Sequence, residues 1–265
     1  MNTHKRLFSV LALIVAQALL IMTLVRPAHA ESASSSPGGA ANFPVEFTDC
    51  VESIGVTLVS TERARALVPS EFHLVGEGTP VTPLVVRTAR CSIAVAGQKP
   101  NVGSIGQIGL VIFPPDFTGD INNYTLLYYT TDAELANHLI RLGVGAQHVQ
   151  NIAYGYVPGL AGSPAPFLVD VPRPGDPTLS LSGRVTRSET PSGSFVANWW
   201  QNGRCGNVKM NTDVPAIYIG SADVTLTTDS DNELGLLIAG GSTGFPVLQQ
   251  FNTFSTAHMQ AAVAP

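Results

Sequence analysis

Runs of alternating apolar and polar residues, separated by short turns, constrain the fold of this chain more than any other feature. From residue 83 onward the pattern indicates strands over 84–96, 103–113 and 124–130. The turns between them, 97–101 and 114–116, are rich in glycine, proline and polar residues. Strands at this spacing are typical of an antiparallel sheet or a closed barrel. We therefore predict a mainly β (α+β) fold, an antiparallel curled sheet or cone-like barrel with two or three short helices.

One helix is predicted directly after the third of these strands, within the stretch 124–152. Thr131 and Glu134 have the spacing of a capping box, and Gly143 supplies a C-terminal stop. Three leucines share one face of this predicted helix, namely Leu135, Leu139 and Leu142. The glycine-rich turn that follows leads into another predicted strand, so the unit runs strand, helix, turn, strand.

The remaining pattern continues the sheet on both sides of this unit. Strands are predicted over 45–59, 179–185, 194–201 and 217–228. Short helices are predicted over 60–68, which ends at a proline, and over 255–262 near the C-terminus. The proline- and glycine-rich interval 158–177 is predicted to be a long loop, either a crossover or a lid.

The order of elements across roughly residues 55–160 resembles the acetoacetate decarboxylase-like superfamily. In that family the turn after the helix carries a Gly-Tyr-Pro-Lys type motif, and its lysine forms a Schiff base with a β-keto acid. Here Gln147 or His148 stands where that lysine would be. The family also tends to carry a glutamate in the strand before this unit, where this chain has Gln107. The resemblance implies the family's fold without its nucleophile.

Two lysines follow residue 30, and neither matches the family motif. Lys99 lies in a polar turn, which favours a solvated amine. Lys209 alternates with Asn207 and Asn211 on one face of a strand, a face that meets either solvent or the cavity of a barrel. His148 is the candidate for a ligand hydrogen bond or a general acid or base. Arg87 is a candidate for pairing a carboxylate or for a salt bridge at the rim.

The first 30 residues have the pattern of a secretory signal peptide. Lys5 and Arg6 precede an apolar run over 7–25, and cleavage is predicted after Ala30. An uncleaved anchor is the alternative, because the apolar run is long enough to span a bilayer. Residues 31–44 are rich in small residues and predict a flexible linker, followed by a single domain over 45–265. We expect a secreted or periplasmic protein.

Charge restricts the partners of the mature chain. Removing three basic residues of the first 30 leaves 14 − 3 = 11 Lys and Arg against 19 Asp and Glu, a net charge of −8. Such a surface disfavours nucleic acid and, after cleavage, an anionic membrane. The expected partner is a small-molecule ligand. The sequence leaves the oligomeric state open, and a homo-oligomer is compatible with it.

Cys50, Cys91 and Cys205 all follow the signal peptide, an odd number for an oxidising compartment. One disulfide with one free or intermolecular thiol is the simplest account, and three pairings are open. We favour Cys91 with Cys205, because both lie in apparent strands far apart in sequence. A catalytic thiol is the alternative, although no cysteine lies in a recognised nucleophile motif.

Because the lysine of the family motif is absent, the sequence favours ligand binding over Schiff-base catalysis. No histidine or cysteine spacing indicates a metal site, and we expect no cofactor. The leading hypothesis is a protein that holds a small apolar or carbonyl-containing ligand in its central cavity through Gln107, Gln147, His148 and Arg87, without Schiff-base catalysis. One alternative is a non-covalent lyase or hydratase that uses His148. Another is a lipocalin-like carrier or a surface structural protein.

Overall fold

A computed structural model describes residues 42–157, 159–171, 179–204 and 206–264. The predicted signal peptide, and the predicted linker up to residue 41, lie outside the described residues. The first strand begins at Phe43, so the last two residues of the predicted linker belong to the sheet.

The described residues form twelve strands of one sheet and three short helices. The strands are β1 (Phe43–Ser60), β2 (Val81–Val95), β3 (Asn101–Val111), β4 (Ile121–Thr130), β5 (Ala146–His148), β6 (Ala153–Tyr156), β7 (Ala165–Val171), β8 (Leu179–Thr186), β9 (Gly193–Gly203), β10 (Gly206–Thr227), β11 (Ser242–Thr243) and β12 (Leu248–Val263). The helices are α2 (Thr61–Arg65), α3 (Ala133–Leu142) and α4 (Glu233–Leu237). The predicted mainly β class with a few short helices is confirmed.

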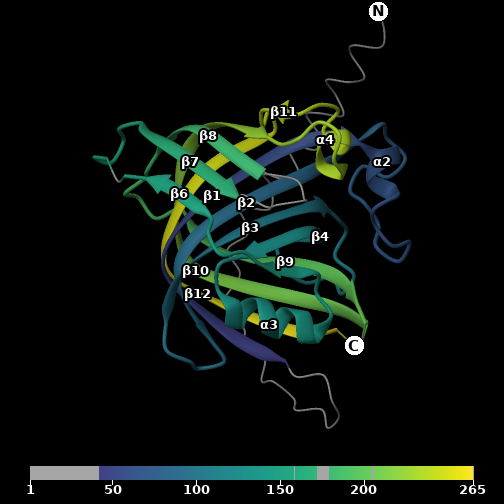
Figure 1. Cartoon of the computed structure of the whole chain (residues 1–265), viewed down its shortest axis with the longest axis horizontal. Coiled ribbons are helices and arrows are strands. Elements are labelled where there is room, and N and C mark those ends of the chain that lie inside the picture. Colours follow the sequence, from purple (N-terminus) through teal and green to yellow (C-terminus); the bar gives the residue numbers. More distant parts are fainter. Residues whose placement is uncertain (1–41, 158, 172–178, 205, 265) are drawn as a thin grey trace, which may run out of the picture. The chain divides into compact units, whose positions relative to one another are not determined.

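The strand order explains why the sheet is curled. The strands pair in the order β12-β1-β2-β3-β4-β9-β10-β8-β7-β6, and β12 also pairs with β10 (Figure 1). Pairing therefore runs in a closed circuit through seven strands, from β12 through β4 and β9 to β10 and back. Most pairs are antiparallel as predicted, but β4 runs parallel to both β5 and β9, so the sheet is mixed.

Two apolar cores lie on the two faces of this sheet, because successive side chains of a strand point to opposite faces. One core, here called the α3-side core, contains the three leucines of α3 and residues of β1, β2, β10 and β12 such as Phe47, Cys91, Met210 and Phe254. The other, the β7-side core, contains residues of β7 and β8 together with Trp200 and Phe251. Figure 1 shows α3 and the β7–β8 pair near opposite ends of the sheet.

Helix α3 forms where the sequence predicts it, with its cap one residue later. The carboxylate of Asp132 accepts a hydrogen bond from the amide of Leu135 and is the N-cap. The predicted cap, Thr131, instead accepts a hydrogen bond from the amide of Ser104 in β3. Gly143 ends the helix with a left-handed φ of 93°, as predicted.

Two predicted elements are wrong. Residues 255–262 belong to β12 and not to a helix, because Ala257, Met259 and Ala261 alternate into the α3-side core with exposed residues between them. The interval 158–177 is not all loop, since Ala165–Val171 form β7. Residues 158 and 172–177 of this interval lie outside the described residues. The third helix is α4, in a segment for which the sequence pattern predicts no element.

The predicted Cys91–Cys205 disulfide is also wrong. Cys91 is bonded to Cys50, which links β2 to the neighbouring strand β1 beside a bulge between Thr48 and Val51. Both cysteines are buried in the α3-side core. Cys205 lies outside the described residues. A disulfide is consistent with an oxidising compartment.

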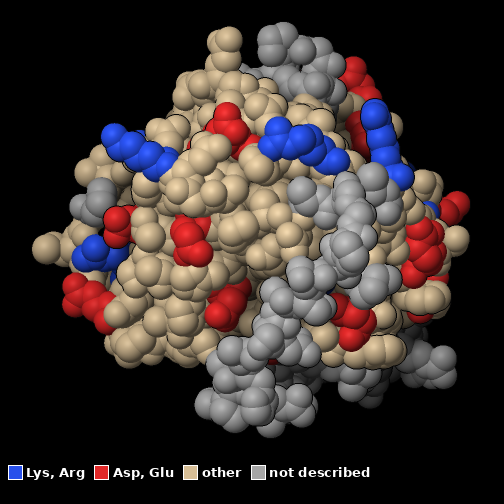
Figure 2. All heavy atoms as spheres, turned by 90° about the horizontal axis from the view of Figure 1, so that it is seen from below, with Lys and Arg blue, Asp and Glu red and all other residues tan. Residues whose placement is uncertain are grey.

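Among the described residues, none of the helices has the length and apolar character needed to cross a membrane. Charged side chains are sparse on the face drawn in Figure 2, and neither sign forms a continuous patch there.

Candidate functional site

Four polar side chains lie next to one another across four adjacent strands. They are Asn252 of β12, Glu52 of β1, Arg87 of β2 and Gln107 of β3. In the sheet register Glu52 lies opposite Asn252, and Arg87 lies opposite Gln107. Glu52 lies opposite Ala89 and is therefore diagonal to Arg87. We call these four residues the buried polar chain.

Hydrogen bonds connect the buried polar chain from end to end. The side-chain amide of Asn252 donates to Oε2 of Glu52 at 3.2 Å. Nε of Arg87 donates to Oε1 of Glu52 at 2.5 Å, and Nη1 of Arg87 donates to Oε1 of Gln107 at 3.3 Å. The Glu52–Arg87 ion pair thus lies between the side-chain amides of Asn252 and Gln107. The hydrogen bond at the centre of the buried polar chain is therefore one between charged groups.

The buried polar chain points into the α3-side core. Its neighbours two residues along each strand, among them Cys50, Ala89, Ile105 and Phe254, belong to that core. Glu52, Gln107 and Asn252 are each 1% exposed, whereas the side chain of Arg87 keeps 13% of its surface accessible.

The Arg87 guanidinium stays charged in this environment. Burial alone would lower its pKa, but the ion pair and hydrogen bond with Glu52 outweigh that effect and raise it. Tyr128 of β4 lies opposite Gln107, and burial raises the pKa of its phenol, so that ring stays neutral. The site therefore holds one positive and one negative charge that compensate each other.

Both ends of the buried polar chain carry unsatisfied groups. Nε2 of Gln107 and Oδ1 of Asn252 are buried without a hydrogen-bond partner. Their orientation follows from the charges between them, because Arg87 requires the oxygen of Gln107 and Glu52 requires the nitrogen of Asn252. Buried polar groups are nearly always satisfied, so each of these atoms is a place where a ligand group could bind.

Partly exposed apolar side chains lie next to this site and against the same core, and we call them the rim. Ile54 lies directly opposite Arg87, and Ile219 directly opposite Asn252. Val56, Val111 and Phe195 also pack partly buried against the α3-side core. Apolar walls with a few convergent polar groups are the usual composition of a small-molecule site.

The structure brings together two of the four predicted ligand residues, Arg87 and Gln107. Gln147 lies in β5, where the register pairs Ala146 with Tyr128 on the α3 side, so Gln147 points to the opposite face. Oε1 of Gln147 is buried there without a hydrogen-bond partner. His148, the predicted acid or base, is exposed.

Sequence reasoning missed Glu52 and Asn252. Glu52 carries a weak signal, since the residues two places before and after it, Cys50 and Ile54, are both apolar. Asn252 carries a weaker one, since only Phe254 on its C-terminal side is apolar. Glu52 is also the only Asp, Glu, Lys, Arg or His of the segment 50–59. Nothing in the sequence indicates that the two meet, because they are 200 residues apart.

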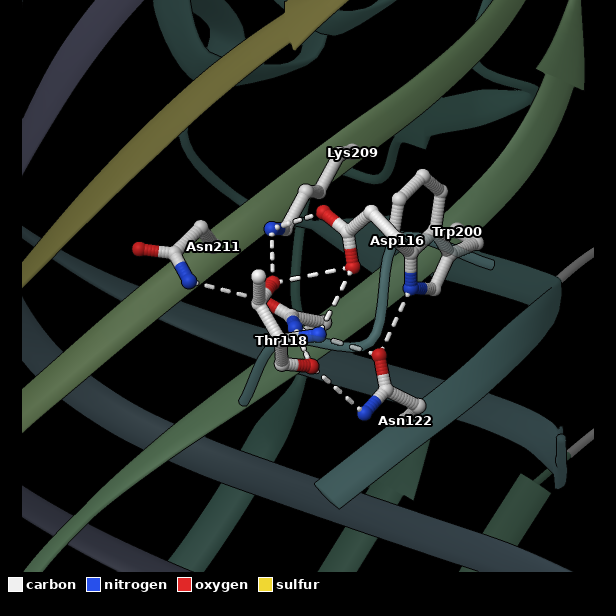
Figure 3. A network of polar contacts seen from close by, with 7 residues as sticks. Asp116, Thr118, Asn122, Trp200, Lys209 and Asn211 are labelled. Carbon is white, nitrogen blue, oxygen red and sulfur yellow. Dashed lines mark hydrogen bonds and ion pairs between the residues drawn. The ribbon is translucent and has the colours of Figure 1, made fainter. Parts of the chain in front are cut away.

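Lys209 lies on the other face of the sheet. Its neighbours Val208 and Met210 point into the α3-side core, so Lys209 projects away from the buried polar chain. Its Nζ lies 2.6 Å from both Oδ2 of Asp116 and Oγ1 of Thr118, and 5.4 Å from the centre of the Trp200 ring (Figure 3). These contacts hold the loop between β3 and β4 against β9 and β10.

Three asparagines complete this second network. Asn198 donates to the carbonyl of Thr118 and to Oδ1 of Asn122. The same Oδ1 of Asn122 accepts the indole N–H of Trp200 (Figure 3). Asn211 donates to Asn198. These hydrogen bonds hold the loop between β3 and β4 in place. Lys209, the lysine of this network, is paired with Asp116. Lys99 is exposed in the turn between β2 and β3.

The Lys209–Asp116 ion pair should make the free energy of unfolding depend on pH in the acid range. Burial opposes the charge of Asp116, but hydrogen bonds from Lys209 and Thr118 outweigh it and lower the pKa of the carboxyl from 3.8. A lowered pKa in the folded state stabilises the fold above pH 3.8, and this contribution is lost as the pH falls through the lowered pKa. Asp116 is 37% exposed, so we expect Lys209→Met to cost less than about 1 kcal/mol.

Urea unfolding near neutral pH and below pH 3.8 checks this expectation. The cost of Lys209→Met should shrink on the acid side. An equal cost on both sides would contradict it.

No family model matches the chain, and no curated protein matches it in sequence. Solved structures do match it. The enduracididine biosynthesis enzyme MppR with HEPES buffer bound has a TM-score of 0.51 at 10% identity, covering 85% of this chain and 87% of that one. MppR complexed with pyruvate has a TM-score of 0.50 at 11% identity, covering 87% and 91%.

A structure of acetoacetate decarboxylase matches equally well. Its TM-score is 0.50 at 10% identity, and the match covers 85% of this chain and 88% of that chain. Likeness at such low identity concerns the fold and leaves the chemistry of each site open. The chain has the acetoacetate decarboxylase-like fold that its sequence resembles.

Proposed function

We propose that this protein binds a small carbonyl-containing or apolar molecule at the buried polar chain, without forming a Schiff base. The observation that carries the proposal is the pair of unsatisfied atoms, Nε2 of Gln107 and Oδ1 of Asn252, beneath a partly exposed apolar rim. A bound carbonyl or hydroxyl group would satisfy them, and an apolar group would pack against the rim.

The positions of the lysines support the non-covalent part of the proposal. Lys209 is held by Asp116 on the opposite face of the sheet, and Lys99 is exposed. A carbon–nitrogen bond to the ligand would need an amine beside it. One protein of the same fold, MppR, has been solved in complex with pyruvate, which supports a small carbonyl compound as ligand. The predicted signal peptide and the Cys50–Cys91 disulfide support action outside the cytoplasm.

Ligand entry requires motion at the rim. Glu52, Gln107 and Asn252 are each 1% exposed, so a ligand must displace rim side chains such as Ile54 to reach them. The exposed position of His148 gives no support to an acid–base reaction at this site.

Ligand-observed NMR with a panel of small carbonyl compounds tests the proposal. We expect at least one compound to bind the wild-type protein and to lose binding in Gln107→Leu, because its hydrogen-bond donor is gone. Gln98→Leu, which changes an exposed glutamine, is the matched control and should bind normally. If Gln107→Leu folds poorly, Ile54→Trp, which fills the rim, should also abolish binding.

Borohydride treatment of the protein with the same compounds tests the absence of a Schiff base. The intact mass should stay unchanged. A reduced adduct on Lys209, or binding that survives in both Gln107→Leu and Ile54→Trp, would refute the proposal.

A further inference from the structure

We infer that the buried polar chain selects an uncharged carbonyl compound, such as an amide or a hydroxyketone, and rejects the corresponding carboxylate. This inference rests on the proposed function, since it names the class of ligand for the same site. It starts from the charges of the four residues. Arg87 is the cation that a carboxylate would need, and Nε of that guanidinium already binds Glu52 at 2.5 Å. Glu52, 1% exposed, compensates the charge of Arg87.

A carboxylate ligand would meet an unfavourable field at this site. To reach Arg87 it must lie near the carboxylate of Glu52, and like charges repel strongly where water is excluded. If the ligand carboxylate instead took the place of Glu52 on Arg87, Glu52 would stay buried without a cation, which is strongly unfavourable. Neither amide of the buried polar chain carries a charge, and Tyr128 beside Gln107 is neutral. No free positive charge therefore remains for an anion in this group of residues.

The unsatisfied atoms instead complement a neutral ligand. Nε2 of Gln107 can donate to a carbonyl oxygen, and Oδ1 of Asn252 can accept from a hydroxyl or an amide N–H. A ligand that cannot form these hydrogen bonds would leave the buried polar groups of the site unpaired, which costs free energy. The site therefore discriminates against such a ligand. An amide in place of a carboxylate keeps the carbonyl, adds a donor and removes the charge.

Isothermal titration of the wild-type protein with matched pairs tests the inference directly. The pairs are pyruvamide with pyruvate and acetoacetamide with acetoacetate, at neutral pH. We expect the amide of each pair to bind at least about tenfold more tightly than its carboxylate. If the carboxylates bind as tightly or more tightly and still depend on Gln107, the inference is overturned while the proposed function stands. If no member of either pair, and no compound of the wider panel, binds, the proposed function fails and the inference fails with it.

A change at Glu52 tests the cause of the selectivity. Glu52→Gln leaves the charge of Arg87 uncompensated, so the preference should reverse in favour of the carboxylate. Glu46→Gln alters a half-exposed glutamate of the same strand that pairs with His258, and should keep the preference for the amide. If Glu52→Gln is only marginally folded, its melting temperature should rise more with pyruvate than with pyruvamide. A preference for the amide that persists in Glu52→Gln would overturn the inference.

Discussion

Replacing Arg87 by methionine is expected to destabilise the fold by about 3–5 kcal/mol. The change leaves the carboxylate of Glu52, with 2% of its side chain exposed, buried without a cation. It also removes the donor that binds Gln107. The free energy of unfolding, measured with urea at neutral pH, checks this value.

Two further variants separate the ion pair from simple loss of side-chain volume. The double variant Glu52→Leu with Arg87→Met removes both charges and should recover much of the loss, because no unpaired charge stays buried. Arg90→Met changes an exposed arginine of the same strand and should cost little. If Arg87→Met costs no more than Arg90→Met, Glu52 and Arg87 do not form the buried pair described above.

Removing the Cys50–Cys91 disulfide is expected to have an effect of similar size. The bond closes a loop across a sequence separation of 41, and loop-closure entropy predicts a loss of about 4 kcal/mol. The variant is Cys50→Ala with Cys91→Ala, compared with the wild type by urea unfolding. Cys205→Ala serves as the control and should keep the disulfide.

Peptide mapping of the non-reduced protein checks the pairing itself. We expect the peptides of Cys50 and Cys91 to be linked. A peptide that links Cys91 to Cys205 would contradict the structure and restore the pairing that sequence spacing favours.

The parts of the fold that local patterns decide could be predicted from the sequence. The alternation of apolar residues identified most strands, and three leucines followed by Gly143 identified α3. The capping residue was displaced because Thr131 and Asp132 can both cap a helix. The amide of Ser104, in a strand 27 residues earlier, donates to Thr131 and leaves Asp132 to cap the helix.

The parts that depend on strand register could not be predicted. Cys50 reaches Cys91 only because β1 pairs with β2 around a bulge. Gln147 turns away from Gln107 because β5 pairs parallel with β4 in a register that no local pattern specifies. Arg87 and Gln107 were each identified singly, but their contact with Glu52 and Asn252 follows from the order of β12, β1, β2 and β3.

The side-chain amide signals of glutamine test the central claim most directly, because Gln107 offers its unsatisfied Nε2 to the ligand. NMR spectra of the ¹⁵N-labelled protein would be recorded during titration with pyruvamide. We expect the side-chain amide of Gln107 to shift with saturation while that of exposed Gln98 stays in place. Saturable binding of pyruvamide that leaves the Gln107 signal unmoved would contradict the account.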